Sequence, residues 1–186
     1  TGWPDGTAAE RVQRARAVMD AVETLRRLPA PTPLVTDDVA RWLPARATNP
    51  RGDLPQVHAS AFVDPTAILC GRVVVHENVF IGPYAVIRAD EVDEDGYKEP
   101  ITIGADSNIQ DGVVIHSKSG AAVTIGERTS IAHRAIVHGP CTVGDDVFIG
   151  FNGALFNCTV AQGCVVRHNA VLDGCHLPPD FYVPST

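Results

Sequence analysis

The sequence lacks the features that mark a membrane protein or a nucleic-acid-binding protein. Its 186 residues contain no run of 18 apolar residues, so we expect no transmembrane helix. The N-terminus lacks a charged start followed by an apolar stretch, so no signal peptide is expected, and we expect a cytoplasmic protein. The formal net charge of −7 argues against nucleic acid and against an anionic membrane surface as the main partner.

Cysteine is scarce, and its pattern excludes the usual cysteine sites. The chain has five cysteines, an odd number, and no C-x-x-C pair, which disfavours a cysteine metal site. We expect buried or half-buried thiols in a reducing compartment. The cysteines are Cys70, Cys141, Cys158, Cys164 and Cys175.

The remaining composition is typical of a soluble globular protein, with 45% hydrophobic and 20% charged residues. The length is sufficient for one domain with a real core. The 16 glycines and 14 prolines predict a fold with many corners.

Residues 8–28 predict an amphipathic α-helix, because apolar residues recur at helical spacing after a capping box of Thr7 and Glu10. This helix would dock on its own domain or on a neighbouring subunit; a membrane-surface or regulatory role is the alternative. Prolines then break the helix, a short second helix is expected over 36–43, and 44–57 has the composition of an irregular approach. We therefore divide the chain into an N-terminal helical extension and linker, 1–57, and a second domain, 58–186.

From residue 63 onwards, aliphatic residues recur every six positions, a period that neither a helix nor simple alternation explains. Seventeen aliphatics fall in this register with three breaks, and a column of mostly small residues runs four places after them. The aliphatics are Val63, Leu69, Val75, Ile81, Ile87, Ile103, Ile109, Ile115, Ile125, Ile131, Val137, Val143, Ile149, Leu155, Val160, Val166 and Leu172.

The period of six predicts an all-β solenoid in which each hexad forms one short strand and a corner. Three hexads would make one triangular coil, giving about five and a half stacked coils. The pattern resembles that of the hexapeptide-repeat proteins, which wind as a left-handed parallel β-helix. The left hand comes from this resemblance, because general connection rules favour the right. Two breaks predict loops extruded within 91–100 and near Ser117–Ala122.

Three histidines, His116, His133 and His138, are candidate metal ligands. Assigning hexads to faces puts Arg88, His116 and His138 in one outer column on successive coils, about 4.8 Å apart. Two imidazoles at this spacing can converge on one metal ion. His133 belongs to a different face, one coil above Asp111, so a three-histidine site requires a second subunit, as in a trimer. Three imidazoles leave a fourth position for water, which the metal would convert to a hydroxide near neutral pH.

Several motifs resemble those of the γ-class carbonic anhydrases, including the carboxysomal members. They cover about residues 58–186. They are Arg88–Glu91, Asn108–His116, His133–Pro140, Val147–Phe151 through Asn157, and Pro178–Pro179 to Pro184.

The resemblance implies a homotrimer with metal sites at its interfaces, His116 and His138 coming from one chain and His133 from its neighbour. Gln110 would hydrogen-bond the metal-bound water or bicarbonate, with Asn108 nearby. Arg88, Asp90 and Asp111 would form an interface ion-pair network, for which a purely structural clamp is the alternative.

Two features depart from the family pattern. The family's well-studied enzymes carry an acidic loop with a proton-shuttle glutamate after the first ligand histidine, whereas here a short Ser117–Gly120 segment follows. Acidic residues gather instead in the earlier insertion, so we expect Glu91 or a loop neighbour to carry protons, a solvated loop being the alternative. The family also usually continues into a C-terminal helix along the solenoid, and the predicted helix at 8–28 is a candidate for that groove.

The leading hypothesis is a metal-dependent carbonic anhydrase acting on CO2 and bicarbonate. Zinc is the expected cofactor, although iron(II) and cobalt(II) also suit three imidazoles. Three alternatives stay open. They are a metal-hydroxide enzyme acting on another small electrophile, a catalytically inactive trimeric scaffold, and a hexapeptide acyltransferase.

Overall fold

The computed structural model describes residues 45–185, which lie within one compact unit, Asp38–Thr186. The predicted helices at 8–28 and 36–43 lie outside the described residues. Within 45–185 the chain forms short strands and corners and no helix. No described residue belongs to a helix long and apolar enough to span a bilayer.

Twenty-one strands form three parallel sheets of seven strands each. Sheet A contains β1 (Ala45–Ala47), β4 (Ile68–Gly71), β7 (Val86–Ala89), β10 (Val114–Ser117), β13 (Ile136–Gly139), β16 (Ala154–Phe156) and β19 (Val171–Asp173). Sheet B contains β2 (Gln56–Val57), β5 (Val73–Val75), β8 (Ile101–Ile103), β11 (Val123–Ile125), β14 (Cys141–Val143), β17 (Thr159–Val160) and β20 (His176–Leu177). Sheet C contains β3 (Phe62–Val63), β6 (Phe80–Ile81), β9 (Asn108–Ile109), β12 (Ser130–Ile131), β15 (Phe148–Ile149), β18 (Val165–Val166) and β21 (Tyr182–Val183).

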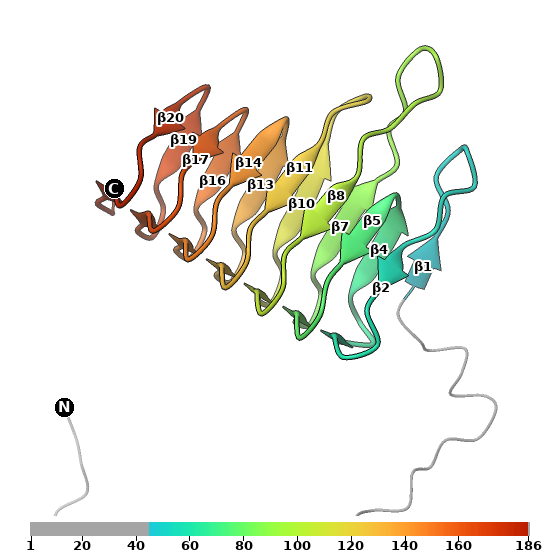
Figure 1. Cartoon of the computed structure of the whole chain (residues 1–186), viewed down its shortest axis with the longest axis horizontal. Helices are drawn as coiled ribbons and strands as arrows, with labels where there is room; N and C mark the ends of the chain where they lie inside the picture. Colours follow the sequence, from blue (N-terminus) through green and yellow to red (C-terminus); the bar gives the residue numbers. More distant parts are fainter. Residues whose placement is uncertain (1–44, 186) are drawn as a thin grey trace, which may run out of the picture. The chain divides into compact units, whose positions relative to one another are not determined.

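The chain visits the sheets in the order A, B, C, so that every third strand stacks on the one before, and the predicted left-handed parallel β-helix is confirmed (Figure 1). The repeating aliphatics fill its interior. All of them are buried except Val63, which is half-buried against the core, and the column of small residues is buried as well. The hexad register therefore specifies which residues face inward on every coil.

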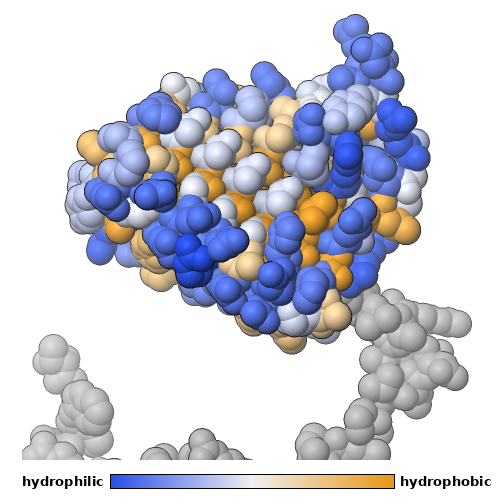
Figure 2. Space-filling model, in the orientation of Figure 1, coloured by the Kyte–Doolittle hydropathy of each residue, from blue (hydrophilic) through white to orange (hydrophobic). Residues whose placement is uncertain are grey.

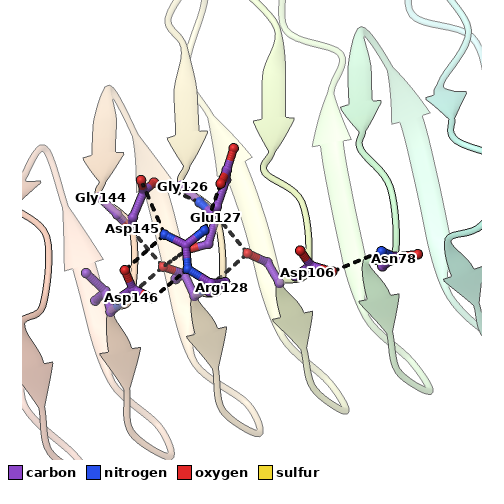
Figure 3. A network of polar contacts seen from close by, with 11 residues as sticks. Asn78, Asp106, Gly126, Glu127, Arg128, Gly144, Asp145 and Asp146 are labelled. Carbon is purple, nitrogen blue, oxygen red and sulfur yellow. Dashed lines mark hydrogen bonds and ion pairs between the residues drawn. The ribbon is translucent and has the colours of Figure 1, made fainter.

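The corners between sheets B and C show how a six-residue repeat turns. One residue per corner has a positive φ of 52–57° on four successive coils, at Asn78, Asp106, Arg128 and Asp146. Asparagine and aspartate tolerate this left-handed conformation better than most residues do. Arg128 is held there by Asp146, with Nε 2.8 Å from Oδ1 and Nη2 3.0 Å from Oδ2 (Figure 3).

The β-helix is longer than the sequence predicts, with seven coils instead of about five and a half. The expectation of an irregular segment over 44–57 is wrong at 45–47 and 56–57, where β1 pairs with β4 and β2 pairs with β5. Arg46 stands where the next coil has Leu69, and β1 is the edge strand of sheet A among the described residues. At the other end, a five-residue step from Leu172 to Leu177 hides β20 from a strict count of six.

The two predicted loops leave the corner between sheets A and B (Figure 1). The first joins β7 to β8 through residues 90–100, and the second joins β10 to β11 through residues 118–122. On the face drawn in Figure 2, pale and apolar side chains occupy the middle and hydrophilic ones gather along the edges and on the projecting loop. The corner that carries both loops is also the corner nearest to His116 and His138.

Candidate metal site

Strands β7, β10 and β13 place the first candidate residues in one column on sheet A. Residue pairing puts His116 opposite Arg88 on one side and opposite His138 on the other. The two imidazole rings are 5.2 Å apart between centroids and inclined at 76°. The predicted vertical pair of histidines is therefore present, and it arises because both residues follow a buried aliphatic of the repeat.

His138 has its ring orientation fixed by its own backbone. Its Nδ1 lies 3.0 Å from the carbonyl oxygen of Gly139. A carbonyl only accepts hydrogen bonds, so this contact requires the proton on Nδ1 and leaves the Nε2 lone pair free. The ring of Phe156, on the next coil, packs 5.2 Å away. A hydrogen bond from one ring nitrogen to a backbone carbonyl, with the other nitrogen available to a metal, is the arrangement that metal-binding histidines commonly adopt.

The side chain of His116 is 16% exposed, compared with 46% for His133. Its Nε2 lies 3.4 Å from Asp90 Oδ1 and 3.5 Å from Glu91 Oε1. Burial, followed by the nearby Arg88 guanidinium, lowers the pKa of His116, although Glu91 and Asp90 act in the opposite direction. The imidazole is therefore neutral at neutral pH, which is the form that binds a metal.

Arg88 and Asp90 form a pair within the chain beside this histidine. The Arg88 Nε is 3.2 Å from Asp90 Oδ2, and an Arg88 Nη2 is 3.4 Å from His116 Nε2. Because the pair is partly exposed, its contribution to stability is small, and its main effect is to orient the Asp90 carboxylate toward His116.

Asn108, Gln110, Asp111 and His133 form a second group, at the corner between sheets C and A. The exposed His133 has its Nδ1 3.7 Å from Asp111 Oδ2 on the coil below, as predicted, and its ring lies 5.3 Å from the Phe151 ring. The buried Oδ1 of Asn108 has no hydrogen-bond partner among residues 45–185. No hydrogen bond or ion pair within residues 45–185 joins this group to the pair on sheet A.

The described part of the chain holds no cluster of three or more histidine, cysteine or acidic side chains that could bind a metal by itself. The donors on sheet A nevertheless fit one: His116 is neutral, His138 presents a free Nε2, and the Asp90 and Glu91 carboxylates approach the same side. What this half-site lacks is a third imidazole. The roles predicted for Asn108, Gln110, Asp111 and His133 thus depend on a second subunit and stay predictions.

Sequence reasoning missed two neighbours of the site. Phe156 occupies the position above His138 in the same column, which the register could have indicated. Lys98, in the first loop, is buried although it is charged. No pattern in the sequence distinguishes it from a solvated loop lysine.

The chain is similar to three groups of characterised proteins, although no protein-family model matches it. It is 41% identical over 140 residues to the carboxysome assembly protein CcmM of Nostoc sp., covering 70% of this chain and 24% of that protein. It is 35% identical over 161 residues to the carbonic anhydrase of Methanosarcina thermophila, covering 76% and 63%. It is 40% identical over 106 residues to the carnitine operon protein CaiE of Escherichia coli O157:H7, covering 57% and 50%.

Solved structures support the same fold. A hexapeptide transferase family protein from Anaplasma phagocytophilum superposes with a TM-score of 0.57 at 26% identity, covering 76% of this chain and 75% of that one. A putative acetyltransferase of Bacillus cereus reaches a TM-score of 0.65 at 24% identity, which is a likeness of fold alone.

The chain spans about a quarter of the length of CcmM and 63% of the length of the carbonic anhydrase. The similarity covers 70% of this chain for CcmM and 76% for the carbonic anhydrase. By its repeat, its fold and these relatives, the chain is a homologue of the γ-class carbonic anhydrase of Methanosarcina thermophila and of CcmM, and it has the β-helix fold of the hexapeptide-repeat proteins.

Proposed function

We propose that the chain is a metal-dependent carbonic anhydrase that interconverts CO2 and bicarbonate at the subunit interfaces of a cytoplasmic homotrimer. The observation that carries the proposal is the register of β10 and β13, which stacks His116 and His138 beside Asp90 and Glu91. Similarity to the carbonic anhydrase of Methanosarcina thermophila supports it.

Sheet A supports the trimer, because its outer surface is apolar between the two groups of candidate ligands. One outward column contains the exposed Ile68, Ile136 and Val171 and the half-buried Val86, Val114 and Ala154. The His116 and His138 column borders it toward sheet B, and the His133 corner precedes it on the other side. Three copies with sheet A facing a common axis would bury this column and bring the His133 corner of each copy beside the histidine pair of the next.

Different residues would bind the metal, orient water or bicarbonate, and transfer the proton. His116 and His138 of one subunit and His133 of its neighbour would hold a zinc ion, with iron(II) and cobalt(II) as alternatives. When bound, the metal acts as a Lewis acid that makes water a nucleophile near neutral pH. Gln110 lies at the same corner as His133 and would donate a hydrogen bond that orients water or bicarbonate. Glu91, half-exposed and 3.5 Å from His116, would move the released proton to solvent.

A second candidate is a catalytically inactive trimeric scaffold. The observation that favours it is the 41% identity to CcmM, which is named a carboxysome assembly protein. The scaffold would use the same apolar column of sheet A without chemistry at the interface. Metal content distinguishes the two functions, because a scaffold has no need of a bound ion.

The test combines oligomeric state, metal content and CO2 hydration on the same preparation. Protein loaded anaerobically with zinc, iron(II) or cobalt(II) is measured by light scattering, elemental analysis and stopped-flow hydration. A trimer with about one metal per chain and CO2 hydration supports the carbonic anhydrase. A trimer without metal or activity indicates the scaffold, and a monomer under all conditions contradicts both.

A further inference from the structure

Lys98 is the only charged side chain that is buried within residues 45–185, with 1% of its surface exposed. Its Nζ donates hydrogen bonds to the Ser117 hydroxyl oxygen and to the Ala121 carbonyl oxygen. Ser117 donates to the same carbonyl at 2.8 Å. The Lys98 ammonium is therefore enclosed by Ser117, the residue after His116 at the end of β10, and by Ala121 of the second loop.

Further hydrogen bonds join the two loops on either side of this contact. Glu99 N donates to Gly120 O at 3.0 Å, and Gly120 N donates to Glu91 O at 3.2 Å. Ser119 Oγ donates to Val92 O at 2.9 Å. The backbone of Glu91 is thus fixed from the loop that follows His116, at the start of the acidic segment.

The carboxylates of Glu91 and Asp90 favour the charged form of Lys98. Burial lowers the pKa of Lys98, while Glu91, Asp90 and Glu99 act to raise it. Burying an ammonium costs free energy that a neutral side chain would avoid. A residue serving only to pack the loops would not need a charge, whereas one that also attracts Glu91 and Asp90 would.

We propose that Lys98 is a positioning residue that locks the loop of residues 90–100 to the loop of residues 118–122 and thereby holds Glu91 beside the metal site for proton transfer. The proton-transfer part rests on the proposed carbonic anhydrase function. The locking of the loops does not depend on it.

The test compares Lys98→Met with Lys118→Met in the full-length protein. Methionine keeps the unbranched apolar stem of Lys98 but removes its charge and its donors, and Lys118 is an exposed lysine of the second loop. Amide hydrogen exchange at Gly120 and Glu99 should quicken about tenfold or more in Lys98→Met and stay unchanged in Lys118→Met. Unchanged exchange in Lys98→Met would overturn the lock. If Lys98→Met folds poorly, Ser117→Ala removes one acceptor and should show the same direction with a smaller effect.

Kinetics distinguish positioning of the proton carrier from mere packing. In dilute buffer, kcat for CO2 hydration by Lys98→Met should fall about tenfold while kcat/KM changes less than about twofold, and concentrated imidazole should restore kcat. An equal fall in kcat and kcat/KM at unchanged metal content would overturn the role in proton transfer. If the unaltered protein hydrates no CO2, the proposed function and the proton-transfer role both fail, and the exchange result alone decides for or against the lock.

A second inference concerns two thiols at the same corner near the C-terminal end. Cys158 Sγ and Cys175 Sγ lie 3.5 Å apart on adjacent coils. They are neighbours because each cysteine directly precedes a strand, and these two strands, β17 and β20, pair with each other. Cys158 also borders a cavity of about 140 Å³, and Cys175 is half-buried. Adjacent parallel strands give a Cα separation of about 4.8 Å, within the range that a disulfide bridges.

We infer that Cys158 and Cys175 form a disulfide when hydrogen peroxide is present. The two thiols lose two protons and two electrons to form the S–S bond, and the peroxide is reduced to two water molecules. Burial raises the pKa of the Cys175 thiol to about 11, so oxidation should be slow at pH 7 and faster toward pH 10.

Peptide mapping by mass spectrometry after peroxide treatment tests this pair. A crosslinked peptide joining Cys158 to Cys175, absent in Cys175→Ser, is the expected result. Cys70 is the control, because it is half-buried and has no thiol in contact within residues 45–185. Oxidation at Cys70 without the crosslinked peptide, or a bridge from Cys158 to Cys141 instead, would overturn the inference.

Discussion

The corners between sheets B and C and the corners between sheets A and B differ although the same coils form them. The first kind repeats one backbone conformation at Asn78, Asp106, Arg128 and Asp146, without an insertion (Figure 3). The second kind extrudes two loops, encloses Lys98 and borders the histidine pair. The coils fix the spacing at both, so the His116 and His138 pair lies beside the corner where the repeat is interrupted.

Polar groups are also used differently at the two kinds of corner. Between sheets B and C they satisfy one another: Thr129 Oγ1 donates to Gly144 O at 2.7 Å, and Asp146 pairs with Arg128. Between sheets A and B, the Asp90 and Glu91 carboxylates face His116 instead. A corner whose polar groups are mutually satisfied stabilises the fold, whereas one that leaves donors and acceptors directed outward can bind a ligand.

The strongest way to sharpen this comparison is to remove a ligand from the site corner. His138→Ala should reduce metal content and lower CO2 hydration by at least about a hundredfold, because two imidazoles hold the ion less tightly than three. Elemental analysis and stopped-flow hydration measure both. His176→Ala, an exposed histidine on sheet B, is the control and should change neither. Equal activity in His138→Ala and the unaltered protein would contradict a metal site beside the corner between sheets A and B.

A core substitution tests the packed aliphatic interior on which both kinds of corner are built. Ile131 is fully buried two residues before His133. Ile131→Ala should lower the free energy of unfolding by about 2–5 kcal/mol through lost burial and a cavity. Denaturant titration measures the loss, with the exposed Thr124→Ala as control, expected within about 0.5 kcal/mol of the unaltered protein. A loss as small as that of Thr124→Ala would contradict the packed interior.

Two glycine substitutions compare the tolerance of the corners directly. A Cβ on Gly126 would collide with Asp145 Oδ1 and come within 2.5 Å of the Gly144 carbonyl carbon on the next coil. A Cβ on Gly120, in the second loop, would lie 3.2 Å from the Asp93 side chain at a φ of +70°. Gly126→Ala should therefore cost about 2–3 kcal/mol and Gly120→Ala about 1 kcal/mol, measured by thermal unfolding. The reverse order would show that the inserted corner is the more constrained one.

The smallest expected change in stability concerns the exposed ion pair of Arg128 and Asp146, at a corner between sheets B and C. Hydrogen bonds from Arg128 lower the pKa of Asp146. A carboxylate with a lowered pKa in the folded state stabilises the fold above its ordinary pKa of about 3.9, and this contribution is lost as the pH falls through the lower folded value. Unfolding curves of the unaltered protein and of Asp146→Asn should differ slightly at pH 6 and converge in stronger acid. A difference that grows below pH 4 would contradict this sign.

The interior and the histidine pair were predictable, because the period of six assigns each residue an inward or outward direction. Ile115 and Val137 fix the coil on which His116 and His138 lie, and the pairing confirms it. The end coils were not predictable, since Arg46 interrupts the aliphatic column at β1, the first strand of the described residues. Lys98 was missed for a different reason: its burial depends on how two loops meet, and loop contacts have no period.

The position of the histidine pair along the β-helix bears on which changes in chain length the site can tolerate. Strand β10 is the middle strand of sheet A, with three strands on either side. Each coil of a solenoid contacts only its neighbours, so the effect of local unfolding at an end decreases with every coil in between. Unfolding that starts at either end therefore reaches His116 last. Fusions, truncations or extra repeats at either extremity therefore leave the ligand geometry intact, which makes this module easy to join to other polypeptides.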